Sequence, residues 1–307
     1  MRTKTFSSWF LLILLTYACA IPALASNEVY DVWDGMTLTP VDVSGSTITI
    51  STASELAWLA AQDADYAGKT VALTVNIDLD GKRWTPIGSA ATPFKGRFNG
   101  NGHLFRSLRT FEGTDGIGLF GHVAQAGVIE KIGISGGTLV AKNKRRIGSL
   151  AGVCDGTIRE CWSMAEIAAS GNVTGGLVGE LNSHGTLTDC YYSGLILNAS
   201  DTIGGLVGYN NKGKLTRVYH TGYAKNGKAI VGVDKNGDYT DCYFDRKLYY
   251  QQAGVSASGV TAIDDTDLMY DIFSGITTWT ISAAYRRYPV LTAFENTDAA
   301  ILSAAPM

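Results

Sequence analysis

The feature that most constrains the fold is a Gly-rich pentamer that occurs three times near the middle of the chain. The copies read G-S-L-A-G, G-G-L-V-G and G-G-L-V-G, at residues 148–152, 175–179 and 204–208. Their second residues lie at 149, 176 and 205, so successive copies are offset by 27 and 29 residues. A regular offset of this size predicts a solenoid, because one repeat cannot cover its own apolar face and must stack on its neighbours.

Weaker copies extend the array in both directions. I-G-L-F-G at residues 117–121 precedes it and A-I-V-G at 229–232 follows it, which makes about five units. Each unit holds short runs rich in Val, Ile, Leu, Thr and Tyr, separated by Gly or Asn. Such runs are typical of strands, and no unit has the longer 3.6-residue periodicity of a helix. We therefore predict an all-β fold, a right-handed parallel β-helix.

Each pentamer is followed by a G-x-I/L sequence that in two copies, residues 156–161 and 185–190, ends in Cys. This combined pattern resembles the GLUG-motif repeat proteins of bacterial cell surfaces, and F-N-G-N-G-H at 98–103 is similar to the opening of such arrays. The resemblance covers roughly residues 84–250. It implies an adhesin-like surface protein. The motif also occurs in non-catalytic regions of some immunoglobulin-cleaving metallopeptidases, but no H-E-x-x-H is present here and the four histidines are scattered.

Residues 1–25 have the features of an export signal and are excluded from the fold. They contain two basic residues, an apolar run and an A-x-A cleavage site: Arg2 and Lys4, Trp9–Leu15, and Ala23-Leu24-Ala25. Cys19 offers lipoprotein processing and a lipid anchor as an alternative, although residues 16–18 match a lipobox poorly. We predict a protein that is secreted or displayed on the outer surface of a bacterium.

Two further global features limit the partners. No other apolar run approaches the ~18 residues of a membrane-spanning helix, so no transmembrane segment is expected after signal cleavage. Loss of Arg2 and Lys4 takes the formal charge from −3 to −5, which disfavours nucleic acid as a partner.

We expect three parts after the signal: N-terminal strands with a capping helix, the repeats, and a linker with a C-terminal cap and tail. Their ranges are 26–83, 84–250 and 251–307. A helix over 53–63 would cover the open end of the solenoid, with Thr52 as N-cap and Glu55 completing a capping box. At the far end, we expect Trp279, Tyr288 and Leu291 to close the last coil.

Four cysteines remain after cleavage, and three of them share one repeat position. Cys161, Cys190 and Cys242 alternate there with Ile132 and Val218. This interchange predicts an inward-facing apolar slot with buried free thiols. A Cys161–Cys190 disulfide remains an alternative, because equivalent residues of adjacent coils lie ~4.8 Å apart and an exported chain permits oxidation. The redox state of these residues, and of Cys154, is left open.

Two columns of side chains flank this slot. The preceding position carries charges of both signs, and we expect an exposed column that sets register: Lys131, Glu160, Asp189, Arg217 and Asp241. The following position is aromatic: Trp162, Tyr191, Tyr219 and Tyr243. If the slot faces inward, alternation turns these rings outward, where they form an amphipathic strip for sugar rings or a protein partner. The alternative is that they stack inside the protein or against a neighbouring loop.

Other motifs have simpler explanations than chemistry. The literal G-x-G-x-x-G at residues 116–121 is followed by no helix, residues 234–238 fit a turn better than a calcium loop, and Asp264, Asp265 and Asp267 fit helix capping. The basic residues Lys142, Lys144, Arg145 and Arg146 could meet an acidic glycan, but a solvated loop explains them more simply. We therefore expect no metal, no cofactor and no catalytic residue.

Together these features predict a non-enzymatic, adhesin-like module that binds glycan or extracellular protein through a face of the β-helix. A polysaccharide lyase or glycoside hydrolase is the first alternative, because β-helices also host these activities and Glu160 with Asp189 could form a carboxylate pair. A passive structural spacer is the second.

Overall fold

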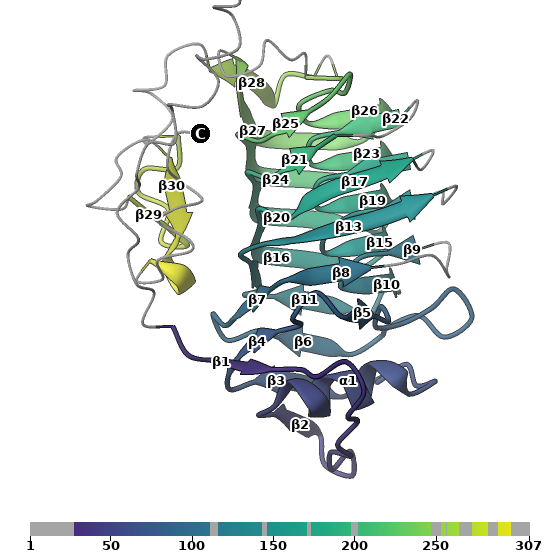
Figure 1. Cartoon of the computed structure of the whole chain (residues 1–307). Coiled ribbons are helices and arrows are strands. Elements are labelled where there is room, and N and C mark those ends of the chain that lie inside the picture. The colour runs from purple at the N-terminus through teal and green to yellow at the C-terminus, as the bar shows by residue number, and fades with distance from the viewer. Residues whose placement is uncertain are drawn as a thin grey trace, which may run out of the picture.

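The computed structural model describes residues 28–110, 116–142, 146–170, 173–197, 202–246, 253–255, 257–263, 272–281 and 288–295. Within these ranges the chain forms a parallel β-solenoid of about six turns (Figure 1), which confirms the predicted fold class. The export signal, Cys19, residues 143–145 of the basic corner, Asp264, Asp265, Asp267 and the C-terminal tail lie outside the described residues.

Four parallel sheets run along the stack, and the longest has thirteen described strands. Its strands are β1 (Tyr30–Val32), β2 (Thr47–Ile50), β3 (Thr70–Leu73), β4 (Asn76–Asp78), β6 (Arg97–Asn99), β7 (Leu104–Arg106), β11 (Val128–Glu130), β12 (Gly133–Ile134), β16 (Thr157–Ser163), β20 (Thr186–Tyr192), β24 (Lys214–His220), β27 (Asp238–Asp245) and β28 (Val260–Ile263). We call this the long sheet.

Three shorter sheets complete each coil. One contains β10 (Phe120–Val123), β15 (Ala151–Cys154), β19 (Val178–Leu181), β23 (Val207–Asn210) and β26 (Val231–Asp234). A second contains β5 (Arg83–Trp84), β8 (Leu108–Thr110), β13 (Gly137–Lys142), β17 (Glu166–Ser170), β21 (Leu195–Ile196) and β25 (Tyr223–Ala224). The third contains β9 (Gly116–Ile117), β14 (Arg146–Ile147), β18 (Val173–Gly175) and β22 (Thr202–Gly204). A separate antiparallel pair, β29 (Trp279–Ile281) and β30 (Pro289–Leu291), precedes a 3-10 turn, η2 (Thr292–Phe294).

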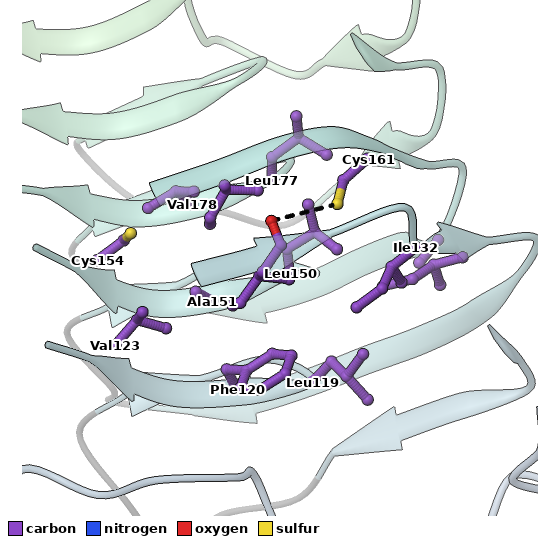
Figure 2. Close-up of a cluster of buried hydrophobic side chains, with 14 of the residues drawn as sticks. Leu119, Phe120, Val123, Ile132, Leu150, Ala151, Cys154, Cys161, Leu177 and Val178 are labelled. Atoms are coloured by element: carbon purple, nitrogen blue, oxygen red, sulfur yellow. Dashed lines mark hydrogen bonds between the residues drawn. The ribbon is translucent and has the colours of Figure 1, made fainter. Parts of the chain in front are cut away.

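The repeated leucines stack directly above one another, as the sequence predicts. The amide of Leu150 donates to the carbonyl of Leu177 at 3.0 Å, and the amide of Leu177 donates to that of Leu206 at 3.0 Å. All three side chains are fully buried in the core. Figure 2 shows Leu119, Leu150 and Leu177 on successive coils, with the cysteines of the same interior beside them.

The glycines of the pentamer are required by close contacts rather than by backbone conformation. A Cβ atom on Gly179 would lie 2.5 Å from the backbone nitrogen of Ile147, because a strand of the four-stranded sheet passes directly across it. A Cβ on Gly205 would lie 2.5 Å from the His220 ring. The pentamer is thus the place where backbone packs against backbone and against buried rings.

The N-terminal end is covered by α1 (Ala53–Ala61), and its capping box is present as predicted. The amide of Glu55 donates to Thr52 Oγ1 at 3.2 Å, and the amide of Thr52 donates to Glu55 Oε2 at 3.0 Å. Leu56 and Leu59 are fully buried against the first coil. Parallel pairing reaches back to this end, since β2 pairs with β3 and β3 pairs with β6.

Candidate binding surfaces

The charged column coincides with a repeated backbone irregularity in the long sheet. Its five residues all have positive φ angles between 49° and 54°: Lys131, Glu160, Asp189, Arg217 and Asp241. This left-handed conformation is uncommon for residues with a Cβ. The pairing between β16 and β20 skips the position, passing from Arg159–Thr188 to Cys161–Cys190. The register is the same before and after it, because both strands advance by two residues. The column is therefore a stacked left-handed bend, which we call the bulge, that divides each long strand into two segments.

The charged column was expected to be exposed, and only its last member, Asp241, is. Asp241 is exposed, Lys131, Glu160 and Arg217 are half-buried, and Asp189 is 4% exposed. Asp189 is buried because both of its oxygens are engaged. Arg217 donates from Nε to Oδ1 at 2.6 Å and from Nη2 to Oδ2 at 2.7 Å, and Trp279 donates from Nε1 to Oδ1 at 2.8 Å. The hydrogen bonds to Asp189 raise the pKa of Arg217. This carboxylate is fixed as an anchor between the bulge and the C-terminal segment.

The aromatic column stacks on the outer side of the long sheet, as alternation predicts. The ring planes of Trp162 and Tyr191 are 4° apart with centroids at 5.7 Å, and those of Tyr191 and Tyr219 are 3° apart at 4.8 Å. The next residue of each strand, such as Tyr192 or His220, instead packs on the interior side. These outer rings form an apolar cluster separate from the solenoid core.

The prediction that this column is an exposed strip is wrong. Trp162, Tyr191 and Tyr219 are fully buried, and Tyr243 is half-buried. They are covered by a second set of apolar side chains from the C-terminal segment: Phe273, Trp279, Tyr288, Val290, Leu291 and Phe294. An uncovered aromatic strip of this length would be a large exposed apolar patch, which soluble surfaces rarely carry. The alternative reading, structural stacking, describes the column.

The same contacts correct the expected position of the C-terminal cap. β29 and β30 lie along the side of the stack, beside β16, β20 and β24, rather than over its far end (Figure 1). Tyr219 donates from its hydroxyl to the carbonyl of Pro289 at 2.6 Å, and Tyr288 donates to Asp245 Oδ2 at 2.8 Å. Trp279, Tyr288 and Leu291 thus close a side of the solenoid, where they pack on the aromatic column.

On the other side of the bulge, the long sheet turns a polar surface outward. We call this surface the polar face, and it consists of two columns from β6, β11, β16, β20, β24 and β27. One column is Arg97, Val128, Thr157, Thr186, Lys214 and Asp238, and the other is Asn99, Glu130, Arg159, Thr188, Thr216 and Thr240. Their side chains lie in successive rows ~4.8 Å apart, in the constant register of the parallel sheet.

A buried carboxylate lies near the β6 end of the polar face. The side chain of Glu130 is only 1% exposed and lies between Arg97 and Arg159, whose side chains are 50% and 44% exposed. Arg97 donates from Nε to Oε1 at 2.6 Å, and Arg159 donates from Nε to Oε2 at 2.8 Å. Sequence analysis missed this group. Glu130 and Arg159 each directly precede a residue of the charged column, Lys131 and Glu160. Comparing these preceding positions across the repeats would have placed Glu130 beside Arg159.

The cysteines are buried free thiols, as the repeat position predicts. Cys154, Cys161, Cys190 and Cys242 are all unpaired and buried, and no Cys161–Cys190 disulfide is formed. Burial raises the pKa of both Cys154 and Cys242 to about 12, and it raises that of Cys190 well above the usual value. Thiolate chemistry is therefore opposed at these positions.

Two open grooves lie beside the C-terminal end of α1. The larger is about 490 Å³ and is lined by Val43, Asp63, Tyr66, Lys69, Thr92 and their neighbours, and the smaller is about 200 Å³. Lys95 and Asp65 form an ion pair at 2.8 Å at this margin. Within the described ranges, no three His, Cys, Asp or Glu side chains converge as metal ligands, and no helix is long and apolar enough to span a membrane.

Comparison with known proteins supports the repeat architecture but shows no family. No family model matches the sequence. The chain is similar to Halomucin from Haloquadratum walsbyi, with 31% identity over 36% of this chain and 1% of that protein. It is also similar to a "Putative Gly-rich membrane protein" from Evansella cellulosilytica, with 34% identity over 26% of this chain and 10% of that protein. The chain thus spans a small part of these relatives.

A solved structure shares the fold. It is a crystal structure described as a putative immunoglobulin A1 protease from Bacteroides ovatus, with a TM-score of 0.54 over 80% of this chain and 92% of that one. The sequence identity is 18%, so this likeness shows the β-solenoid architecture and nothing about catalysis.

Proposed function

We propose that this chain is an exported, non-enzymatic binding module of the GLUG-repeat type that recognises glycan or extracellular protein through the polar face. One observation carries the proposal. Polar and charged side chains, with Val128 as the one apolar member, recur over six consecutive rows of the long sheet, and the described C-terminal segment covers the neighbouring aromatic column instead. The export signal and the similarity to proteins named Halomucin and Gly-rich membrane protein support a location outside the cell.

The polar face suits binding because its side chains are held in place before any ligand arrives. Thr186 on β20 donates from Oγ1 to the Oγ1 of Thr157 on the adjacent strand β16 at 3.2 Å. Lys214 forms an ion pair with Asp238 at 3.5 Å. The backbone beneath is a continuous hydrogen-bonded ladder. A rigid surface loses little conformational entropy on binding, so even modest contacts contribute to affinity.

The lyase or glycosidase alternative lacks support from the pair on which it depends. Asp189 accepts three hydrogen bonds from Arg217 and Trp279 and lies under the C-terminal segment. Glu160 lies 4.0 Å from Lys131. A carboxylate pair that flanks a sugar bond must face an accessible groove, and Asp189 does not meet this requirement.

The experiment is a binding screen against glycans, mucin and matrix proteins, run together with a product-release assay on the same preparation. Thr188→Tyr and Thr216→Tyr place uncharged bulk on the polar face, and Tyr is well tolerated in strands. Ser170→Tyr, at an exposed position of β17 in another sheet, is the matched control. We expect binding without turnover, weakened about tenfold by the first two changes and not by the third. Released product, or equal weakening by all three, would contradict the proposal.

A further inference from the structure

We propose that the polar face recognises an acidic glycan, and that Arg97 and Arg159 together bind a carboxylate or sulfate group of that glycan. This inference rests on the proposed binding function and specifies its ligand class. Three charged side chains carry it, those of Arg97, Glu130 and Arg159, which come from the first three rows of the face: β6, β11 and β16.

The two arginines carry more positive charge than their carboxylate partner neutralises. Arg97 and Arg159 share one carboxylate, that of Glu130, so the group carries a formal charge of +1. The adjacent Lys131 and Glu160 cancel one another, and Lys214 is paired with Asp238 farther along the face. The part of the polar face on β6, β11 and β16 is therefore cationic, although the whole chain has a formal charge of −3. An anionic ligand is attracted to this point of an otherwise acidic protein.

Glu130 occupies one edge of each guanidinium group. Both arginines contact Glu130 through the edge formed by Nε and Nη2. Neither donates from Nη1 to another residue in the described part of the chain. Because a guanidinium presents donors along two edges, the end formed by Nη1 and Nη2 can still bind a second oxyanion in a bidentate manner. Both arginine side chains are half-exposed, so a ligand in solution can reach them.

Glu130 holds both arginine side chains in place. Glu130 is 1% exposed and accepts from both arginines, so it fixes two long side chains that would otherwise sample many rotamers. The two guanidinium groups thus converge from rows that are two coils apart, about 10 Å along the stack. A single anion lying above Glu130 would be reached from both sides. We assign Glu130 as a positioning residue and the two arginines as ligand-binding residues.

The rows around this group fit a sugar chain better than an isolated anion. Thr157, Thr186 and Thr188 follow Arg97 and Arg159 along the same two columns. The spacing of successive rows is close to the length of one sugar in an extended polysaccharide. A glycan that runs along the stack would place its acidic group on the arginines and its hydroxyl groups on the threonines.

The test uses the full chain and three polysaccharide probes: polygalacturonate for carboxylates, heparin for sulfates, and dextran as a neutral control. Affinity is measured for Arg97→Gln, Arg159→Gln and the control Lys225→Gln, which removes the same charge at an exposed position directly after β25 in another sheet. We expect each arginine change to weaken an acidic probe about tenfold and Lys225→Gln to leave it nearly unchanged. Thermal unfolding shows that each variant is folded. If either glutamine variant unfolds, Arg97→Lys and Arg159→Lys keep the charge next to Glu130 but lose the bidentate edge, and we expect the same direction of change.

The outcomes separate this inference from the proposed function. Equal losses in the arginine variants and Lys225→Gln would overturn it in favour of unspecific charge attraction. Tight binding of dextran or of a neutral screen ligand, unaffected by the arginine changes, would also overturn it but leave the binding module intact. A folded chain that binds no glycan and no protein would contradict both.

Discussion

Trp279 donates a hydrogen bond from its indole Nε1 to Oδ1 of Asp189 at 2.8 Å, across 90 residues of sequence and inside a fully desolvated contact. This bond joins the C-terminal pair of strands to the bulge of the long sheet. It explains why Asp189 is the buried member of the charged column, and why the aromatic rings beside it are unavailable as a binding strip.

Trp279→Phe tests this contact. The change keeps most of the ring packing against Tyr219 and Phe273 but leaves a buried carboxylate oxygen with one donor fewer. We expect the free energy of unfolding to fall by about 1–3 kcal/mol, and protease cleavage in the C-terminal segment to become faster. Ile276→Ala, at an exposed position of the same segment, is the control. Equal stability in the two variants would show that the hydrogen bond does not hold the segment.

Leu177→Ala tests the stacked core. Leu177 is fully buried between Leu150 and Leu206, and strands above and below restrict relaxation around the cavity. We expect a loss of about 2–5 kcal/mol in the free energy of unfolding, measured by denaturant titration. Met36→Ala, at a position 83% exposed, should change it by less than about 0.5 kcal/mol. A small effect at Leu177 would be incompatible with a continuous packed interior.

The repeats made this core predictable, whereas the covering of its side was not. Leu150, Leu177 and Leu206 could be placed together because they recur in one sequence pattern, and Thr52 could be assigned as an N-cap from its neighbour Glu55. Alternation also placed Trp162 correctly on the outer side. Whether an outer column meets solvent depends on a distant segment, and no local pattern links Trp279 to it. A repeat pattern therefore defines the faces of a solenoid but not which face is free.

Glu130 shows a second limit of sequence reasoning. The predicted charged column contains Lys131, which directly follows Glu130 in the sequence, so Glu130 itself was not in it. The bulge at Lys131 changes which side chains share a face. The partner of Glu130, Arg97, belongs to a coil in which the repeat is weak. Only the observed register of β6, β11 and β16 brings the three side chains together.

His220 makes stability depend on pH. Burial lowers the pKa of His220 to about 3, from an ordinary value of 6.5. Between these values the unfolded chain binds the proton and the folded chain does not, so this contribution is complete above pH 6.5 and is lost as pH falls toward 3. His220→Phe should reduce the dependence of unfolding free energy on pH in this window, since the equivalent residue of the next coil is Phe244. The exposed His184, changed to Gln, serves as control. An unchanged slope in His220→Phe would contradict this explanation.

The four buried cysteines predict strong protection from alkylation. Their thiols are inaccessible, and burial raises the pKa of three of them. Iodoacetamide should modify Cys154, Cys161, Cys190 and Cys242 at a negligible rate in the native protein and rapidly in denaturant, as followed by site-resolved mass spectrometry. Fast native labelling of Cys161 or Cys190 would show that the interior opens between coils.

Hydroxyl-radical footprinting with bound polygalacturonate is the most direct test of where ligand binds. Binding on the polar face should reduce labelling of Arg97, Val128 and Arg159, while the half-buried Tyr243 and the exposed Ile276 of the C-terminal segment keep their labelling. Protection of Tyr243 and Ile276 instead, with unchanged labelling of the two arginines, would contradict the assignment and return the aromatic column as the binding surface.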